Sequence, residues 1–282
     1  MGTVEMLGWL LEPFQLAFAQ RGLAELLMLS VGAGLLGTWI VLRGLAFYAH
    51  AVGMAAFPGL VLADGLGFSA PLGAFGAAIV FAGGLERISR SRRSAYDSLT
   101  ALALVGMLVV GVILASDVFG SGSNVDTLLF GSLLAIGSLD VLLAALASGI
   151  ALAATLVLGR IWLATGFDAQ SARALGLRSA APDAVLLVLI ALVATAAVSA
   201  IGALLATTVL VVPAATARLW TQRLRVWQVT SIAIVAAEGT AGLWLSIQTN
   251  APPGATIAML AGGVFALSLL ARRILESRLL PE

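Results

Sequence analysis

Very few side chains of this sequence could bind an ion or react. His50 is the only histidine, and Met54 follows it by four residues, a spacing that places both on one face of a helix. Imidazole suits zinc, copper or nickel, and a thioether suits softer ions. His50 and Met54 are therefore candidate metal contacts. A hydrogen-bonded packing role for a lone histidine remains the alternative.

Glu238 is an ionisable residue inside the long apolar segment AIVAAEGTAGLW. Within a membrane such a charge is costly, which makes it a functional hypothesis. It could face a path and supply a carboxylate, pair with an Arg, or stay protonated. Glu25 lies nearer the end of an apolar run, so we expect it to be solvated or to cap its helix.

The composition sets the class of protein that these residues belong to. Of 282 residues, 61% are hydrophobic and 10% are charged, and the mean hydropathy is +1.08. A soluble domain is far more charged, so the sequence predicts an integral membrane protein. The net charge of +1 gives no case for nucleic-acid binding.

Several kinds of chemistry are excluded by missing residue types. Every basic residue is Arg, so there is no P-loop or Schiff-base lysine, and with no Cys there is no disulfide or thiolate metal site. No HExxH or GxSxG pattern occurs either. We expect no catalytic residue and no enzyme activity in this chain, and any ATP hydrolysis belongs to a partner subunit.

Apolar runs predict an all-α polytopic bundle of about eight or nine transmembrane helices, at about 20 residues each. The whole chain, residues 1–282, is expected to be one transmembrane domain, with residues 1–20 as an interfacial N-terminal segment. The candidate spans are 22–42, 50–67, 70–86, 98–116, 138–159, 183–199, 201–217, 226–248 and 254–271.

Arg-rich loops predict the orientation, because such loops stay in the cytoplasm. The four groups are Arg87 to Arg93, Arg160 to Arg178, Arg218 to Arg225, and Arg272 to Arg278. They alternate with Arg-free loops, which places the C-terminus in the cytoplasm. The side of the N-terminus stays open.

Two of the spans contain residues that break helices. One holds Pro58 and Gly59 after His50, and the other holds Gly202 and Pro213. Interrupted helices often mark the substrate path of a transporter, so these four residues are predicted path hinges. The alternative is that Pro and Gly are simply commoner in membrane helices.

The loop ATGFDAQSARALGLR, residues 164–178, is predicted to form a small surface helix. Asp168 is placed to stabilise its start, and Gly176 fits its C-terminal stop. An ordinary capped loop helix would show the same pattern.

Five stretches, in this order, resemble the membrane subunits of metal-ion ABC importers for zinc, manganese or iron. They are GTWIVLRGLAFYAHAVGMAAFPG (37–59), LLFGSLLAIGSLD (128–140), FDAQSARALGL (167–177), IGALLATTVLVVPAATARL (201–219) and PPGATIAML (252–260). The resemblance covers nearly the whole chain, and the combination is specific.

The resemblance implies a type II ABC importer permease in the cytoplasmic membrane. Its implied partners are a second permease copy or close paralogue, a cytoplasmic ABC ATPase, an extracytoplasmic metal-binding protein and membrane lipid. The implied substrate is a zinc or manganese ion, with no permanent cofactor. A coupling helix at 168–177 would dock the ATPase through Phe167, Asp168, Ala172 and Gly176, and segments 46–59 and 201–217 would form the path.

The chain departs from the family pattern at four positions. His50 and Met54 stand where the family usually has Asp and His, and Ser132 and Asn250 stand where it usually has Asp. A hard cation prefers carboxylate oxygens. These replacements keep two alternatives open: a permease for a metal chelate or another small solute, and a scaffolding or sensing protein.

Overall fold

A computed structural model describes residues 12–91, 96–119, 125–168 and 180–279. Over these ranges the chain forms helices joined by short turns, and none of the described residues is in a strand. The predicted all-α class is confirmed. The described helices are η1 (Glu12–Gln15), α2 (Ala17–Arg43), α3 (Ala46–Leu66), α4 (Ala70–Ser91), α5 (Tyr96–Ile113), η3 (Leu114–Val118), α6 (Val125–Phe130), η5 (Leu133–Ala135), α7 (Ser138–Phe167), α9 (Ala180–Ala196), α10 (Val198–Ile201), α11 (Ala206–Trp220), α12 (Leu224–Thr249) and α13 (Pro253–Leu279).

The apolar helices coincide with the predicted spans. Six of the described helices are long and apolar enough to cross a membrane, and three shorter apolar helices lie at Ala70–Leu85, Ala180–Ala196 and Ala206–Trp220. Each predicted range overlaps one of these helices. The polytopic architecture is therefore confirmed.

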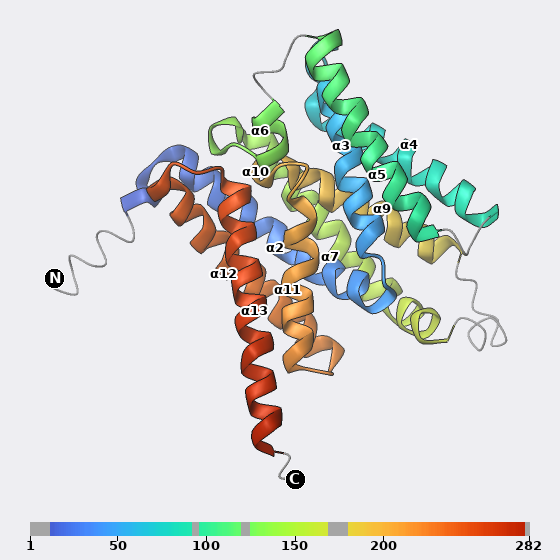
Figure 1. Cartoon of the computed structure of the whole chain (residues 1–282), viewed down its shortest axis with the longest axis vertical. Coiled ribbons are helices and arrows are strands. Elements are labelled where there is room, and N and C mark those ends of the chain that lie inside the picture. Colours follow the sequence, from blue (N-terminus) through green and yellow to red (C-terminus); the bar gives the residue numbers. More distant parts are fainter. Residues whose placement is uncertain (1–11, 92–95, 120–124, 169–179, 280–282) are drawn as a thin grey trace.

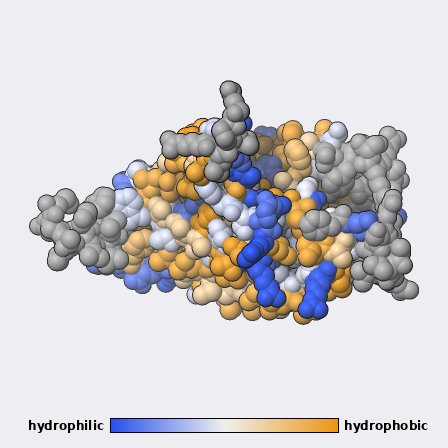
Figure 2. Space-filling view, turned by 90° about the horizontal axis from the view of Figure 1, so that it is seen from below, coloured by the Kyte–Doolittle hydropathy of each residue, from blue (hydrophilic) through white to orange (hydrophobic). Residues whose placement is uncertain are grey.

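Successive long helices alternate in direction (Figure 1). The C-terminus and the turn between α11 and α12 lie at one end, and α6 and α10 lie at the other. The first end carries the Arg residues of the α11–α12 turn, Arg218, Arg223 and Arg225, together with Arg272 and Arg273 of α13. Figure 2 shows hydrophilic side chains there against hydrophobic surface. The positive-inside rule makes it the cytoplasmic end. Because α2 begins at the opposite end, residue 17 lies on the extracytoplasmic side.

The bundle has two mostly buried helices and an exposed apolar periphery. Most of α2 and α3 is buried, whereas α5 and α13 bury only a minor part of their surface. Leu102 on α5 and Leu267 on α13 are 71% and 68% exposed. In water such surfaces would be costly. In a bilayer such surfaces are expected to contact acyl chains or another apolar helix. His50, by contrast, lies on the mostly buried helix α3.

Two predicted boundaries differ from the structure. The helix α2 already begins at Ala17, so the predicted interfacial segment 1–20 ends inside a spanning helix, and its residues 1–11 lie outside the described part. The predicted surface helix 164–178 also starts too early, because α7 continues to Phe167. Both differences have the same cause. The helix α2 begins before the polar residues of its first turns, and α7 ends after the sequence has become more polar, so polarity alone misplaces the helix ends by a few residues.

Candidate functional site

His50 on α3 contacts the first turn of α11. Its Nδ1 atom lies 3.3 Å from Oγ1 of Thr207, and that hydroxyl donates a long hydrogen bond of 3.5 Å to the carbonyl oxygen of Ala49. A hydroxyl that donates to Ala49 can accept from Nδ1–H. This assignment leaves Nε2 of His50 with its lone pair free, the form in which histidine binds a metal ion.

Met54 lies one turn further along α3 and is fully buried, whereas His50 is half-buried. Across the described ranges, no three His, Cys, Asp or Glu side chains come together as a metal site. The described residues of one chain therefore offer no complete metal site, and the metal contact of His50 and Met54 stays a prediction.

No break occurs at Pro58 and Gly59, contrary to the interruption considered from the sequence. The helix α3 continues from Ala46 to Leu66 through Pro58, since a proline removes only one intrahelical hydrogen bond. A Cβ atom at Gly59 would lie 2.2 Å from the carbonyl oxygen of Gly73 on α4. Gly59 therefore permits the close approach of α3 and α4, and its hinge role stays a prediction.

The other predicted interruption is present, at Gly202 between α10 and α11. Gly202 has a φ of +86°, and a Cβ there would lie 2.2 Å from the carbonyl oxygen of Leu129. The N–H of Ala203 donates to the carbonyl oxygen of Leu128 over 3.0 Å. The backbone freed by the break is thus paired with α6, as a membrane interior requires. Pro213 lies inside the continuous helix α11.

Glu238 on α12 is 5% exposed, and neither of its carboxyl oxygens has a hydrogen-bond partner among the described residues. The pairing with an Arg that the sequence left open is therefore not seen there. A Cβ at the next residue, Gly239, would lie 3.6 Å from Cβ of Leu26 on α2. The helix α12 thus packs against α2 at the residue next to Glu238.

The expected solvated or capping role of Glu25 is wrong. Glu25 is 0% exposed, and both of its carboxyl oxygens lack a partner among the described residues. It is buried because α2 starts eight residues earlier, at Ala17, and carries Glu25 into the bundle. Asp140 at the start of α7 is the charged group that acts on it electrostatically.

Two of the positions that depart from the family pattern meet on the extracytoplasmic side. Ser132 and Asn250 line one cavity of about 410 Å³, which Asp126 also lines. Asn250 ends α12 in the left-handed conformation, with a φ of 53°. Nothing in the spacing of the sequence indicated that Ser132 and Asn250 would be neighbours.

The predicted ATPase-coupling residues are only partly described. Phe167 is the last residue of α7, and Asp168 follows it as an exposed C-cap. Ala172 and Gly176 lie outside the described residues, so the helix predicted at 168–177 stays a prediction.

The two ends that flank residues 169–179 are joined to α2. Arg43 donates from Nη1 to Oδ1 of Asp183 over 2.6 Å and from Nη2 to the hydroxyl of Thr165 over 3.2 Å. The indole N–H of Trp162 donates to the carbonyl oxygen of Pro182 over 2.8 Å. One guanidinium thus connects the C-terminal ends of α2 and α7 with the start of α9.

Sequence reasoning missed Thr207, Arg43 and Asp183. Thr207 lies in the run 201–219 and Arg43 in the stretch 37–59, so both were inside segments already singled out. Their partners are 157 and 140 residues away along the chain. Spacing along a single sequence carries no signal for such pairs.

Comparison with known proteins gives consistent matches. The model of the ABC 3 transport family matches residues 15–272. A "Probable iron transport system membrane protein" of Haemophilus influenzae is 28% identical, over 95% of this chain and 99% of its own length. The manganese transport system membrane protein MntC of Halalkalibacterium halodurans is 28% identical, over 89% of this chain and 86% of its own length.

A solved structure shares the fold over almost the whole chain. PsaBC from Streptococcus pneumoniae, solved in complex with Fab, matches with a TM-score of 0.82 and 26% identity, covering 92% of this chain and 94% of that chain. Together with the family match over nearly all residues, this similarity leads to one conclusion: the chain belongs to the ABC 3 transport family and is a multi-pass permease subunit of an ABC transporter in the cytoplasmic membrane.

Proposed function

We propose that this permease moves a divalent transition-metal ion into the cytoplasm, with manganese as the first expected cargo and zinc as the second. The observation that carries the proposal is the 3.3 Å contact between Nδ1 of His50, on the mostly buried helix α3, and the hydroxyl of Thr207. With the proton on Nδ1, this contact leaves Nε2 of His50 free to bind an ion. The relatives named for manganese and iron transport support a metal cargo.

Two permease copies would complete the ion path. One chain offers only His50 and Met54 at this position, and no group of three ligands forms among the described residues. A His50 and a Met54 from each of two copies, meeting at a shared axis, would double the ligand set. The Gly202 break would then be the part of each copy that changes conformation.

A separate cytoplasmic ATPase would supply the energy, since the chain has no lysine for a P-loop. We place its docking site at residues 168–177, through Phe167, Asp168, Ala172 and Gly176. An extracytoplasmic binding protein would deliver the ion. The contacts of Arg43 with α7 and α9 support a route by which motion at the docking site reaches α2 and α3.

The named relatives and the ligand chemistry of His50 favour different ions. Similarity favours manganese, while the chemistry of His50 favours zinc, because manganese prefers oxygen ligands. The neutral Ser132 and Asn250 on the outer face favour the second candidate, a metal chelate. A chelate needs no carboxylate ligands from the protein.

Uptake into proteoliposomes tests this function. The chain is reconstituted with its ATPase and binding protein, and ATP-driven accumulation of manganese and of zinc is measured, with vesicles lacking ATP as the control. We expect accumulation of manganese, and of zinc to a lesser extent. Intact ATP hydrolysis with uptake of neither ion would contradict the bare-ion proposal, and uptake of a chelated metal under the same conditions would establish the second candidate.

A further inference from the structure

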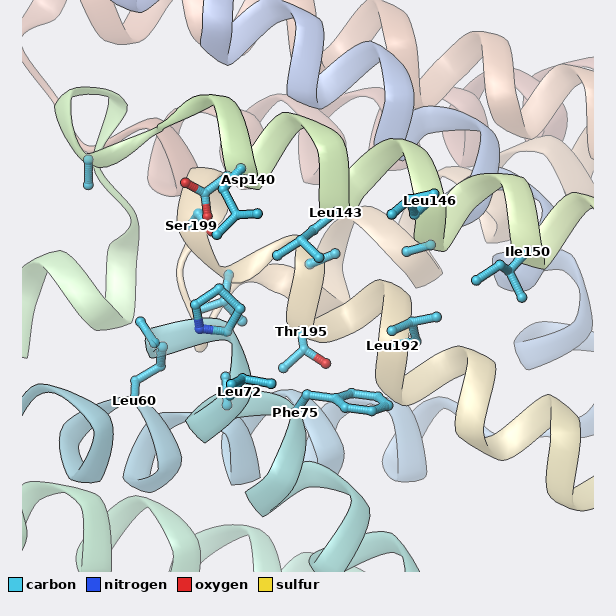
Figure 3. Close-up of a pocket in the computed structure, with 18 of the residues that line it drawn as sticks. Leu60, Leu72, Phe75, Asp140, Leu143, Leu146, Ile150, Leu192, Thr195 and Ser199 are labelled. Carbon is cyan, nitrogen blue, oxygen red and sulfur yellow. Dashed lines mark hydrogen bonds between the residues drawn. The ribbon is translucent and has the colours of Figure 1, made fainter. Parts of the chain in front are cut away.

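A cavity of about 500 Å³ lies between α4 and α7, with α9 as its floor (Figure 3). Its walls are apolar along most of their length, with Leu72 and Phe75 from α4, Leu146 from α7 and Leu192 from α9. Asp140 and Ser199 stand together at one end. We call this cavity the outer groove.

The outer groove faces the membrane. Leu72, Leu146 and Ile150, which line it, are 68%, 53% and 51% exposed. Small residues give it depth, since Ala74 on α4 and Ala147 on α7 also line it and are almost fully buried. An apolar hollow of this kind offers water few hydrogen-bond partners, so hydrocarbon is the occupant that its walls favour.

The length and position of the outer groove match one leaflet of a bilayer. It runs along α7 from Asp140, in the first turn, to Ile150. Ten residues of helix rise about 15 Å, which is half of the roughly 30 Å hydrocarbon core. Because α7 starts on the extracytoplasmic side, Asp140 lies at the level of the outer headgroups.

The polar end of the outer groove, formed by Asp140 and Ser199, carries a carboxylate and therefore favours a lipid headgroup of positive charge. Asp140 accepts hydrogen bonds from the hydroxyl of Ser199 at 2.8 Å and from the N–H of Gly137 at 2.9 Å. A carboxylate has about four acceptor positions, so capacity remains for a further donor. None of the described residues that line the groove is an Arg. A cationic ammonium is therefore favoured there, and an anionic headgroup is opposed.

We propose that the outer groove binds one acyl chain of an outer-leaflet phospholipid with an ammonium headgroup, and that Asp140 holds this ammonium. The proposal does not depend on which cargo the permease carries. Ser199 belongs to α10, shortly before the Gly202 break. The bound lipid would therefore contact α10, directly before the helix break at Gly202.

Photolabelling tests the proposal. The permease, in complex with its ATPase, is placed in nanodiscs that contain phosphatidylethanolamine or phosphatidylglycerol with a diazirine on the same acyl chain, and labelled residues are mapped by mass spectrometry. We expect labelling concentrated on α4 and α7 at the groove. Phosphatidylethanolamine should label about fivefold more than phosphatidylglycerol, as expected for about 1 kcal/mol per charge contact near the membrane surface.

Matched variants separate the groove from the general lipid surface. Leu146→Trp fills the groove and should remove most of the labelling, whereas Leu156→Trp, at a 76% exposed position of α7 outside it, should not. Asp140→Asn should abolish the preference for phosphatidylethanolamine, while Asp117→Asn, an exposed residue outside the groove, should keep it. Ser199→Ala, which leaves the carboxylate in place, should also keep a preference.

Several results would overturn the proposal. Labelling spread evenly over the lipid-facing helices would show that the groove holds no particular lipid. Equal labelling by both lipids in the unaltered protein would remove the role of Asp140. Crosslinks between two copies at Leu72 and Leu146, with no lipid label there, would identify a second chain as the occupant.

Discussion

The guanidinium of Arg43 donates a hydrogen bond of 2.6 Å to the carboxylate of Asp183, and this ion pair joins the end of α2 to the start of α9. The side chain of Arg43 is 14% exposed and that of Asp183 is 34% exposed. Arg43 also holds Thr165 near the end of α7. The pair therefore fixes the relative position of three helices at the cytoplasmic end.

Loss of this pair should destabilise the fold. Arg43→Ala leaves the Asp183 carboxylate without its partner, and we expect the free energy of unfolding to fall by about 1 to 3 kcal/mol. Denaturation of the purified permease, followed by tryptophan fluorescence, measures the change. A double-mutant cycle with Asp183→Ala should give a coupling energy clearly above zero.

The control for that experiment is Glu276→Ala. It removes the exposed pair between Arg272 and Glu276 on α13, which should change stability by no more than about 0.5 kcal/mol. If Arg43→Ala and Glu276→Ala had equal effects, the connecting role of Arg43 would be excluded.

A side chain at Gly59 should disturb the crossing of α3 and α4. In Gly59→Ala the new Cβ would meet the carbonyl oxygen of Gly73, so the helices must move apart, at a cost of about 1 to 3 kcal/mol. Gly76→Ala on α4, where a Cβ meets nothing within 4 Å, should be neutral or slightly stabilising. Thermal unfolding of both variants checks this, and unchanged stability of Gly59→Ala would argue against close packing.

The hydroxyl of Thr207 should matter for transport through His50. Thr207→Val keeps the shape but removes the group that accepts from Nδ1, so we expect metal uptake to fall roughly tenfold, as for lost outer-shell partners of a metal ligand. Thr207→Ser should retain most uptake. Equal uptake by the Val and Ser variants would show that the hydrogen bond does not position His50.

Replacing the two buried glutamates, Glu25 and Glu238, should have the same effect on stability but different effects on uptake. Glu25→Leu and Glu238→Leu each remove a buried carboxyl group without a described hydrogen-bond partner, so both should stabilise the fold by about 1 to 3 kcal/mol. Uptake should be retained in Glu25→Leu and lost in Glu238→Leu if Glu238 lies on the path. Normal uptake by both would remove Glu238 from the path.

Composition and apolar runs were sufficient to predict the membrane class and the position of each spanning helix. Hydropathy reports burial in lipid over about 20 residues, and this property is local in sequence. The break at Gly202 was also predictable. The uninterrupted α3 was not, because a proline and a glycine alone do not show whether neighbouring helices support the backbone through Pro58.

The side-chain partners of the site residues could not be predicted from a single sequence. His50 could be singled out from its residue type and its place in an apolar run, but its contact with Thr207 depends on how α3 crosses α11. The burial of Glu25 similarly depends on where α2 begins. Side-chain pairs between distant helices are set by tertiary packing, which residue spacing does not encode.

If metal ions pass beside His50, as we propose, a His50 variant should lose uptake. Initial rates of ATP-driven manganese and zinc uptake are compared for the unaltered permease and for His50→Ala in proteoliposomes with the ATPase and binding protein, with ATP hydrolysis measured in the same samples. We expect His50→Ala to lose most of the uptake while the complex still assembles and hydrolyses ATP. Unchanged uptake of both ions by His50→Ala would contradict the proposal.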